Sequence, residues 1–449
     1  MDLLVLSRIQ FALTIMFHYI YPPMSIGLGL IIVIMESMYM ITKNPLYHKM
    51  TKFWVKMFGL NFAIGVATGI VMEFEFGTNW STYSRYVGDV FGSALAAEGV
   101  FAFFLESGFL AILLFGWDKV SAGIHWLSAL LVCLGAHFSA IWIIVAGSWM
   151  QTPAGFHIVG HGLTARAEIT DFWAMVFNPS SMERLAHVLV AAWLTGAFFV
   201  LSVSAYYLLK KRHVEFAKTS MRVALVVALI AAVGQMVTGR IGAETVARYQ
   251  PAKLAVMEGN FPANQPAGMY LFGFVDEKNS KVYGLRVPGL LSFLVNNDAG
   301  KPVAGIKSFK KEDLPPINIV FQSYHFMVTI GIALFVLTVI CLMFLRQGKL
   351  FRTTWLLKIL VPAVMLPQIA NQLGWMTAEI GRQTWIVYGL LRTSEGLSKA
   401  VKANAVLISL IMFTFIYLLL FVLYIYLFDS KIKHGPDEFD YDELKHRAN

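Results

Sequence analysis

Long apolar runs separated by short polar connections account for most of the chain. A helix needs about 20 apolar residues to cross the hydrocarbon core of a bilayer, and about nine runs meet this length. They centre near residues 10–35, 53–74, 91–117, 123–149, 185–209, 220–239, 318–345, 355–379 and 403–428. The pattern predicts an all-α integral membrane protein. It divides the chain into helices one to six (1–239), a long polar insertion (240–317), helices seven to nine (318–428) and a polar tail (429–449).

Basic residues in the short connections predict the orientation of these helices. Lysines and arginines gather after the first, fifth and seventh runs, as in the string Lys210, Lys211 and Arg212. Cytoplasmic loops of membrane proteins are enriched in such residues, so we expect these loops to be cytoplasmic. The N-terminus then lies outside, the tail is cytoplasmic, and the insertion forms an extracytoplasmic module.

Composition and cysteine usage narrow the class of protein further. Of the 449 residues, 57% are hydrophobic and 14% are charged, whereas soluble domains carry roughly 25% charged residues. The net charge of +9 resides mainly in short loops, which is a topology signal, so no nucleic-acid partner is expected. Cys133 and Cys341 both lie inside apolar runs, which excludes a disulfide framework, a zinc ribbon and a thiolate-ligated iron–sulfur cluster.

Several polar or metal-ligating side chains lie within the predicted spans, where they are costly and therefore candidates for function. They are His18, Glu98, Glu106, His137, His187, His325, Met327 and Glu379. At a helical rise of about 1.5 Å per residue, most of them converge on the outer part of the bilayer, with Glu106 near its middle.

Imidazole, thioether and carboxylate groups without any thiolate suit haem iron, because His and Met are standard axial ligands. His187 and Met327, at similar predicted depth on different helices, could form a six-coordinate electron-transfer pair. Glu98 and Glu106 lie about 80° apart around a regular helix and could line one polar path. The alternatives are a methionine that only packs and protonated carboxyls that only join helices.

Two prolines predict a kink beside one of these candidates. In the string HYIYPP, Pro22 and Pro23 follow His18. Proline has no N–H to donate to the carbonyl four residues back, so the helix should bend there. A kink beside a ligand can open room for a macrocycle.

Two further strings combine charge with aromatic or apolar neighbours. GWMTAEIGRQTW places Trp375, Glu379 and Arg382 around a helix end, where the arginine could pair the carboxylate or a haem propionate. An aromatic belt with a snorkelling arginine is the alternative. QPAKLAVMEGNF carries Lys253 and Glu258, a donor and an acceptor able to serve the two hydroxyls of a quinol, or else a surface charge pair.

These strings also carry a resemblance that covers nearly the whole chain. HYIYPP, AAEGVFAFFLES, FGWDK, SAIWIIVAGSWMQTPAGF, ERLAHVLVAAW, QPAKLAVMEGNF and AEIGRQTW occur in this order. With them the sequence resembles subunit I of the cytochrome bd family of quinol oxidases. It departs from many members in its short quinol (Q) loop, in Thr384 where GRQPW has proline, and in His325 where some members have arginine. The chain is also similar to the cyanide-insensitive branch of the family.

The resemblance implies a set of haem ligands. His187 and Met327 match the axial ligands of a low-spin haem b. His18 and Glu379 match ligands in a high-spin pair, made of haem b and either haem d or a further haem b. The residues expected beside the haems are Trp375 and Arg382.

The resemblance also implies residues for proton and quinol chemistry. Glu98 is expected close to the high-spin haems, with Glu106 in the proton route that leads to it. Lys253 and Glu258 match quinol-binding positions of the Q loop, so a helix bundle that encloses haems would meet quinol at its outer face.

The implied activity is that of a terminal respiratory oxidase. Such an enzyme oxidises quinol at the outer face and reduces O2 to water, generating proton-motive force without pumping. The expected partners are a second membrane subunit, a small single-helix subunit, quinol and O2, in a bacterial or archaeal cytoplasmic (inner) membrane. One alternative, a proton-coupled secondary transporter, lacks the support of internal repeats. The other, a haem b quinone dehydrogenase that does not react with O2, leaves His18 and Glu379 unexplained.

Overall fold

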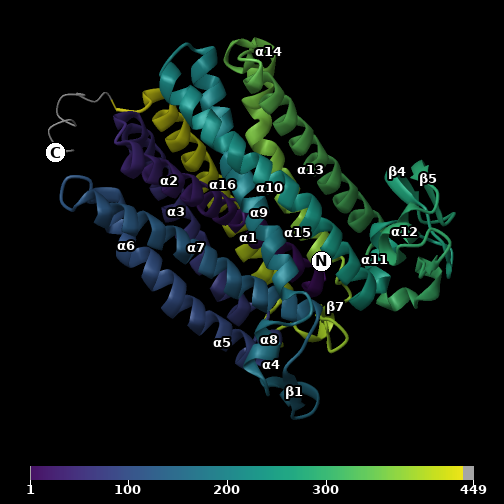
Figure 1. Ribbon diagram of the computed structural model, residues 1–449. Coiled ribbons are helices and arrows are strands. Elements are labelled where there is room, and N and C mark those ends of the chain that lie inside the picture. Colours follow the sequence, from purple (N-terminus) through teal and green to yellow (C-terminus); the bar gives the residue numbers. More distant parts are fainter. Residues whose placement is uncertain (1, 438–449) are drawn as a thin grey trace.

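The computed structural model describes residues 2–437 and contains, within that range, nine helical spans long and apolar enough to cross a membrane (Figure 1). They are α1 (Leu3–His18) with α2 (Tyr21–Thr42), α3 (Pro45–Thr78), α5 (Gly88–Glu98) with η1 (Gly99–Phe103) and α6 (Phe104–Phe115), α7 (Ala122–Gln151), α9 (Ser181–Leu209), α10 (Val214–Tyr249), α13 (Ile317–Arg346), α14 (Thr354–Leu360) with η6 (Pro362–Val364) and α15 (Met365–Ile380), and α16 (Ala403–His434). The predicted all-α membrane fold with about nine spans is confirmed.

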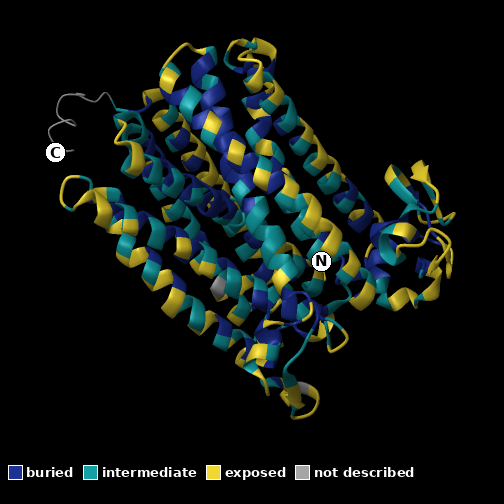
Figure 2. Cartoon of the chain, viewed as in Figure 1, coloured by how far each residue is buried: buried dark blue, intermediate teal, exposed yellow. Residues whose placement is uncertain are grey.

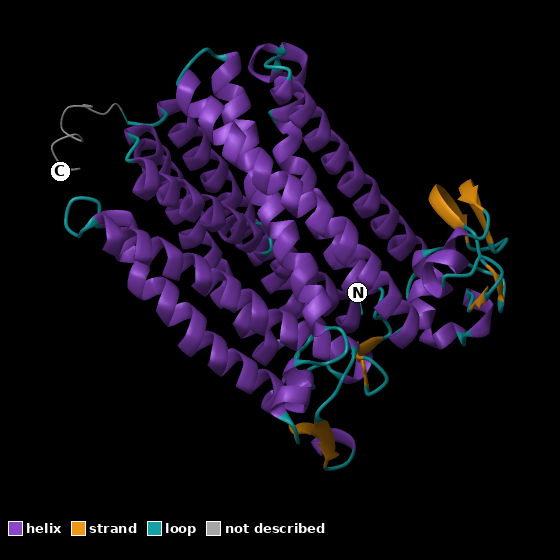
Figure 3. Cartoon of the chain, in the orientation of Figure 1, coloured by secondary structure: helices purple, strands orange, loops and turns teal. Residues whose placement is uncertain are grey.

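Short elements fill the connections. The helices are α4 (Ser81–Tyr86), α8 (Phe172–Val176), α11 (Pro251–Met257) and α12 (Leu290–Asn296), with 3₁₀ turns η2 (Gly162–Thr164), η3 (Ile306–Ser308), η4 (Lys311–Asp313), η5 (Leu350–Arg352) and η7 (Thr393–Glu395). The antiparallel strand pairs are β1 (Phe156–Val159) with β2 (Arg166–Ile169), β3 (Gln265–Pro266) with β6 (Pro302–Val303), β4 (Met269–Asp276) with β5 (Lys281–Val287), and β7 (Trp385–Val387) with β8 (Leu391–Arg392). Figure 3 shows these strands at the end of the bundle opposite the C-terminal end of α16.

Helices α2 and α9 cross at backbone contact. A Cβ atom added to Gly27 would lie 2.1 Å from the carbonyl oxygen of Ala192, and one added to Gly196 would lie 2.3 Å from the backbone of Gly27. Small residues allow membrane helices to approach at backbone contact, so van der Waals packing holds this crossing together. Figure 2 shows exposed residues along the outward faces of the spans. On α16 these include the apolar residues Ile411 and Phe415, as a lipid-facing surface requires.

The chain breaks between α1 and α2, as the two prolines predict. Backbone carbonyls freed by such a break need new partners inside a membrane. The side-chain amide of Gln372 donates to the carbonyl of Met16 (2.8 Å), and that of Gln368 donates to the carbonyl of Ile20 (3.1 Å). Helix α15 therefore stabilises the kink that follows His18.

Two helices continue further than the hydropathy pattern predicts. Helix α10 ends at Tyr249 rather than near residue 239, because polar residues continue it on the helical spacing, with Arg240 donating to Glu244 at 3.1 Å. The connecting segment between α10 and α13 is therefore 250–316. Helix α16 continues to His434, and residues 438–449 of the predicted tail lie outside the described part of the chain.

Candidate functional site

The imidazole of His187 is oriented by a hydrogen bond from α9 to α10. Its Nδ1 lies 2.9 Å from the hydroxyl oxygen of Thr238, and that hydroxyl donates to the carbonyl of Gly234 (2.8 Å). The hydroxyl hydrogen is thus already used, so Nδ1 is the N–H donor and Nε2 carries a lone pair. Among the described residues Nε2 has no hydrogen-bond partner. A histidine that binds a metal through one ring nitrogen usually donates a hydrogen bond from the other, as Nδ1 does here.

Met327 lies on α13 and faces α15. Its sulfur would be 3.0 Å from a Cβ atom at Gly374, so the glycine leaves the thioether the room that any side chain would take. Helix α10 packs against both α9 and α13. The structure thus places Met327 and His187 on two helices that α10 joins.

His18, at the end of α1, has the same arrangement as His187. Its Nδ1 lies 2.9 Å from the hydroxyl oxygen of Thr68, which donates to carbonyl groups of its own helix α3. The Nε2 atom is again the one with the lone pair. The ring would contact a Cβ atom at Gly69 at 3.2 Å. Trp375 stacks on Tyr19, the next residue, with ring centroids 5.6 Å apart.

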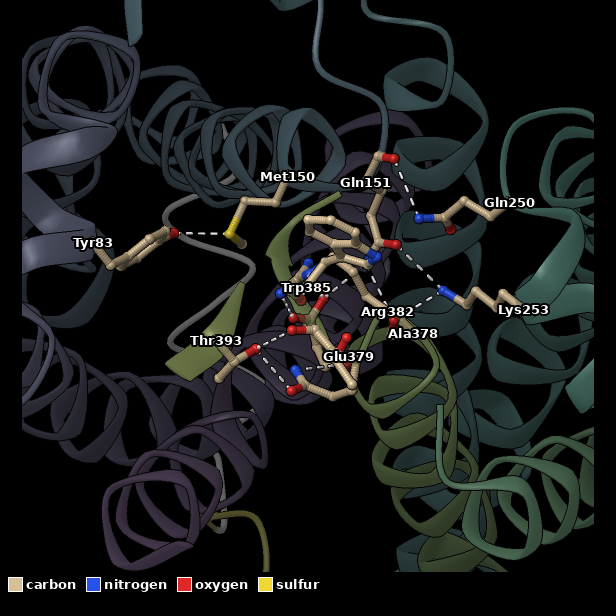
Figure 4. Close-up of polar contacts among 12 residues, drawn as sticks. Tyr83, Met150, Gln151, Gln250, Lys253, Ala378, Glu379, Arg382, Trp385 and Thr393 are labelled. Atoms are coloured by element: carbon tan, nitrogen blue, oxygen red, sulfur yellow. Dashed lines mark hydrogen bonds and ion pairs between the residues drawn. The ribbon is translucent and has the colours of Figure 1, made fainter. Parts of the chain in front are cut away.

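Glu379, near the end of α15, pairs with Arg382 (Figure 4). Both guanidinium Nη atoms donate to the two carboxylate oxygens, and Gln151 donates to one of them at 3.2 Å. Arg382 is only 4% exposed, so the alternative of a snorkelling arginine is wrong. Each carboxylate oxygen keeps lone pairs beyond these bonds.

Lys253 on α11 is buried against the same helix end. Its ammonium group donates to the carbonyl of Ala378 (2.8 Å) and to the side chain of Gln151 (3.3 Å), as Figure 4 shows. A Cβ atom at Gly381 would lie 2.8 Å from the Lys253 side chain, so the glycine makes room for it. Burial, and next the nearby guanidinium of Arg184, hold the pKa of Lys253 well below its ordinary value.

Glu258 caps the other end of α11 and is 2% exposed. The hydroxyl of Tyr324 on α13 hydrogen-bonds the carboxyl group, and the second oxygen, Oε2, has no partner among the described residues. Burial raises the pKa of Glu258 to about 7, an effect that the Tyr324 bond partly offsets. Because Lys253 and Glu258 are both buried, the alternative of a surface charge pair is wrong.

A third group of predicted residues lies between α5, α6 and α7. The hydroxyl of Ser139 donates to Glu98 at 2.6 Å. Glu106 packs so closely on Gly135 that a Cβ atom there would lie 2.4 Å from the glutamate side chain. The π-helix η1 separates the two glutamates. Such bulges turn the backbone less per residue than an α-helix, so Glu98 and Glu106 are closer to one face than the regular spacing predicts.

His137, also a candidate, has both ring nitrogens satisfied. Its Nδ1 lies 2.7 Å from the carbonyl of Cys133, and the indole N–H of Trp193 donates to its Nε2 at 3.0 Å. An imidazole occupied in this way is a link between α7 and α9.

Reasoning from the sequence missed two residues that lie in the candidate site. Gln151, the last residue of α7, contacts both Glu379 and Lys253. Arg184 lies close enough to Glu379, Arg382 and Lys253 to interact with each electrostatically, and its Nε atom is buried without a partner. The only available signal was position, since Arg184 stands three residues before His187 on the same helix face.

This donor set fits a haem. Two histidines present Nε2 lone pairs and a methionine sulfur lies beside a glycine. The guanidinium groups of Arg382 and Arg184 both interact with a single carboxylate, Glu379. The surplus positive charge and the unpaired Arg184 nitrogen suit the propionate groups of a haem. Fold and site together define a membrane-embedded haem protein.

The comparisons with known proteins identify the family. The sequence model of cytochrome bd terminal oxidase subunit I matches residues 6–436. The chain is 41% identical to the cytochrome bd ubiquinol oxidase subunit 1 of Bacillus subtilis (strain 168), covering 99% of this chain and 96% of that one. It is 34% identical to the cytochrome bd-II ubiquinol oxidase subunit 1 of Escherichia coli (strain K12), covering 97% of each. The structure of bd oxidase from Geobacillus thermodenitrificans matches with a TM-score of 0.90 at 29% identity, over 97% of this chain and 99% of that one. The chain belongs to the cytochrome bd terminal oxidase subunit I family.

Membership establishes the activity at the level of the family. The chain is a multi-pass subunit of a quinol:oxygen oxidoreductase in the bacterial cytoplasmic membrane, with haem cofactors and a second subunit as partner. Neither alternative, the transporter or the dehydrogenase, is favoured.

Two of the three departures from the family pattern, Thr384 and His325, make contacts of their own. Thr384 donates to the carbonyl of Glu312 at 3.1 Å and accepts from Arg392 at 2.6 Å, bonds that a proline could not make. His325 lies between two carbonyl oxygens, those of Phe321 and Tyr270, each 2.9 Å from a ring nitrogen. Thr384 thus joins the connecting segment to the turn that follows α15, and His325 joins it to α13.

Proposed function

We propose that His187 and Met327 hold a low-spin haem b, and that His18 and Glu379 hold iron in a high-spin pair of haem b with haem d or a further haem b. The observation that carries this proposal is the fixed tautomer of both histidines, with Thr238 and Thr68 leaving each Nε2 free for iron. When bound, the haems supply the one-electron carriers and the open coordination position that oxygen reduction requires.

Lys253 and Glu258 are proposed to bind quinol. They stand at opposite ends of α11, one facing α15 and the other facing α13. An amine donor and a carboxylate acceptor can hold the two hydroxyl groups of a quinol. The free Oε2 atom of Glu258 is the acceptor for a hydroxyl proton, because it is buried and has no partner.

Protons for oxygen reduction are proposed to reach the site from the cytoplasm. Glu106 receives them near the middle of the bilayer and passes them to Glu98, which Ser139 orients. Protons from quinol leave on the opposite side, which we propose is the outer one, together with the N-terminus and the connecting segment. Because protons are released on one side of the membrane and taken up from the other, charge is separated without a pump. Each charge moved stores about 2.3 kcal/mol per 100 mV of membrane potential. A small single-helix subunit is a further proposed partner.

The test is a reduced-minus-oxidised optical spectrum of the purified complex, followed by acid extraction of its haems. A chlorin band with low- and high-spin haem b supports the bd set, and protohaem alone with quinol-driven oxygen uptake supports the set with haem b only. A complex without haem would overturn both the ligand assignment and the oxidase mechanism.

A further inference from the structure

The β4–β5 hairpin of the connecting segment carries a row of large apolar side chains on one face. Phe272 pairs across the strands with Leu285, and Phe274 pairs with Tyr283. Their exposed fractions are 61%, 51%, 73% and 59% in the order named. A contiguous apolar patch of this kind marks an interaction surface. The chemistry of its occupant follows from where the hairpin lies.

The hairpin is fixed alongside the first turns of α13, which is a membrane span (Figure 1). Three side chains on one face of α13 reach carbonyl oxygens of β4. These contacts join Asn318 to Val275 (3.3 Å), Gln322 to Gly273 (2.9 Å) and His325 to Tyr270 (2.9 Å). The strand edge nearest the helix thus has partners that do not depend on water, as backbone at membrane depth requires.

The length of α13 sets the level of the hairpin. Its 30 residues span about 45 Å, close to the full thickness of a bilayer with its headgroups. His325 lies eight residues beyond the first residue, Ile317, or about 12 Å along the axis. Strand β4 therefore follows the part of α13 that crosses the headgroup layer and enters the top of the acyl chains.

The helix beside the hairpin also exposes apolar side chains. On α13, Ile319 and Phe326 are exposed by 47% and 55%, within the same turns that hold β4. Phenylalanine, tyrosine and leucine on one face, with lysines at the turn, are typical of segments that lie in the membrane interface. Lys278 and Lys281 occupy that turn or its edge.

We propose that the apolar face of this hairpin inserts into the lipid leaflet on the membrane side where the connecting segment lies. Phe272, Phe274, Tyr283 and Leu285 contact lipid at the boundary between headgroups and acyl chains. The side chains at the turn remain in the headgroup layer. This interaction is separate from quinol binding and from the haem ligands, so it stands whether or not those assignments hold.

Site-specific fluorescence on the complete oxidase in phospholipid vesicles tests the proposal. Phe274→Cys carries an environment-sensitive label on the apolar face, and Lys278→Cys carries it at the turn of the same hairpin as the matched control. The two cysteines of this chain, Cys133 and Cys341, are both buried, and the complex without an introduced cysteine gives the background labelling. The vesicles contain phosphatidylethanolamine and phosphatidylglycerol, with a nitroxide high on the acyl chain of a fraction of the lipid.

The nitroxide lipid is expected to quench the label at position 274 several-fold more strongly than at position 278, while aqueous iodide shows the reverse order. Strong iodide quenching at position 274 would place this face in water and overturn the proposal. Protection of position 274 from both quenchers would overturn it too, because a second copy or the partner subunit would then cover the face. Leu285→Cys repeats the test on the other strand, with haem content as the check of assembly.

Discussion

Ionisation of Glu258 should limit quinol oxidation on the acid side of neutrality. The carboxylate must be deprotonated to accept a hydroxyl proton, and its pKa is raised by burial from 4.5 to about 7. Quinol oxidation should therefore slow as the pH is lowered through 7. The ionised fraction is roughly 91% at pH 8 and roughly 9% at pH 6, so kcat/KM for quinol should drop about tenfold between these values.

Oxygen uptake at low quinol concentration measures this fall of activity with decreasing pH, here called the acid limb. Two controls show whether Glu258 causes it. Glu258→Gln keeps the shape and burial of the side chain but cannot accept the proton, so its activity should be low and nearly independent of pH in this range. A one-electron donor that releases no protons bypasses the carboxylate, and the wild-type enzyme should then lose the acid limb.

The reasoning is refuted if Glu258→Gln retains the same acid limb as the wild type. It is also refuted if the limb persists with the one-electron donor, because the titrating group would then lie on the proton route to oxygen. A limb centred near pH 4.5 would show that burial does not govern this carboxyl group in the working enzyme.

Three further changes test other parts of the structure. Glu106→Gln should suppress oxygen consumption while haem content stays largely intact, and unchanged turnover would remove Glu106 from the proton path. Thr238→Val removes the partner of His187 and should lower haem retention or activity about 10- to 100-fold, whereas Thr238→Ser should not, as haem content and midpoint potential will show. Gly27→Ala overpacks the α2–α9 crossing and should lower the stability measured by thermal denaturation by about 1–3 kcal/mol. Gly123→Ala adds a methyl group in open space and should not, so equal stability of the two variants would contradict overpacking at Gly27.

The spans of the bundle were predictable because lipid imposes one rule on every helix. A run of apolar residues must satisfy its own backbone, so length and hydropathy are enough to find nine spans. The ends of helices follow a weaker rule. Helix α10 continues through Arg240 and Glu244 because the i, i+4 pair supports the helix where hydropathy has already fallen.

The chemistry of the site was only partly predictable for a different reason. Potential ligands such as His187 can be found in a sequence because a polar side chain inside a membrane span is costly and usually has a function. Met327 is found with them because its sulfur is a standard haem ligand. The residues that orient these ligands or compensate their charge are of types that also occur at many sites without such a role. Arg184 and Gln151 reach the site only because the last turns of α7 and α15 lie beside the first turns of α9 and α11, and no spacing along the chain encodes that convergence.

The π-helix η1 shows the limit most sharply. Its sequence, GVFAF, has neither proline nor a polar side chain to mark an irregular turn, and the angle predicted between Glu98 and Glu106 assumes an unbroken α-helix. The contact of Glu106 with Gly135 on α7 requires that glycine, because any side chain there would meet the glutamate. Packing against a neighbouring helix therefore positions Glu106, just beyond the end of η1. The contact that positions Glu106 lies about 30 residues away in the chain, or about eight helical turns, beyond the reach of any local sequence pattern.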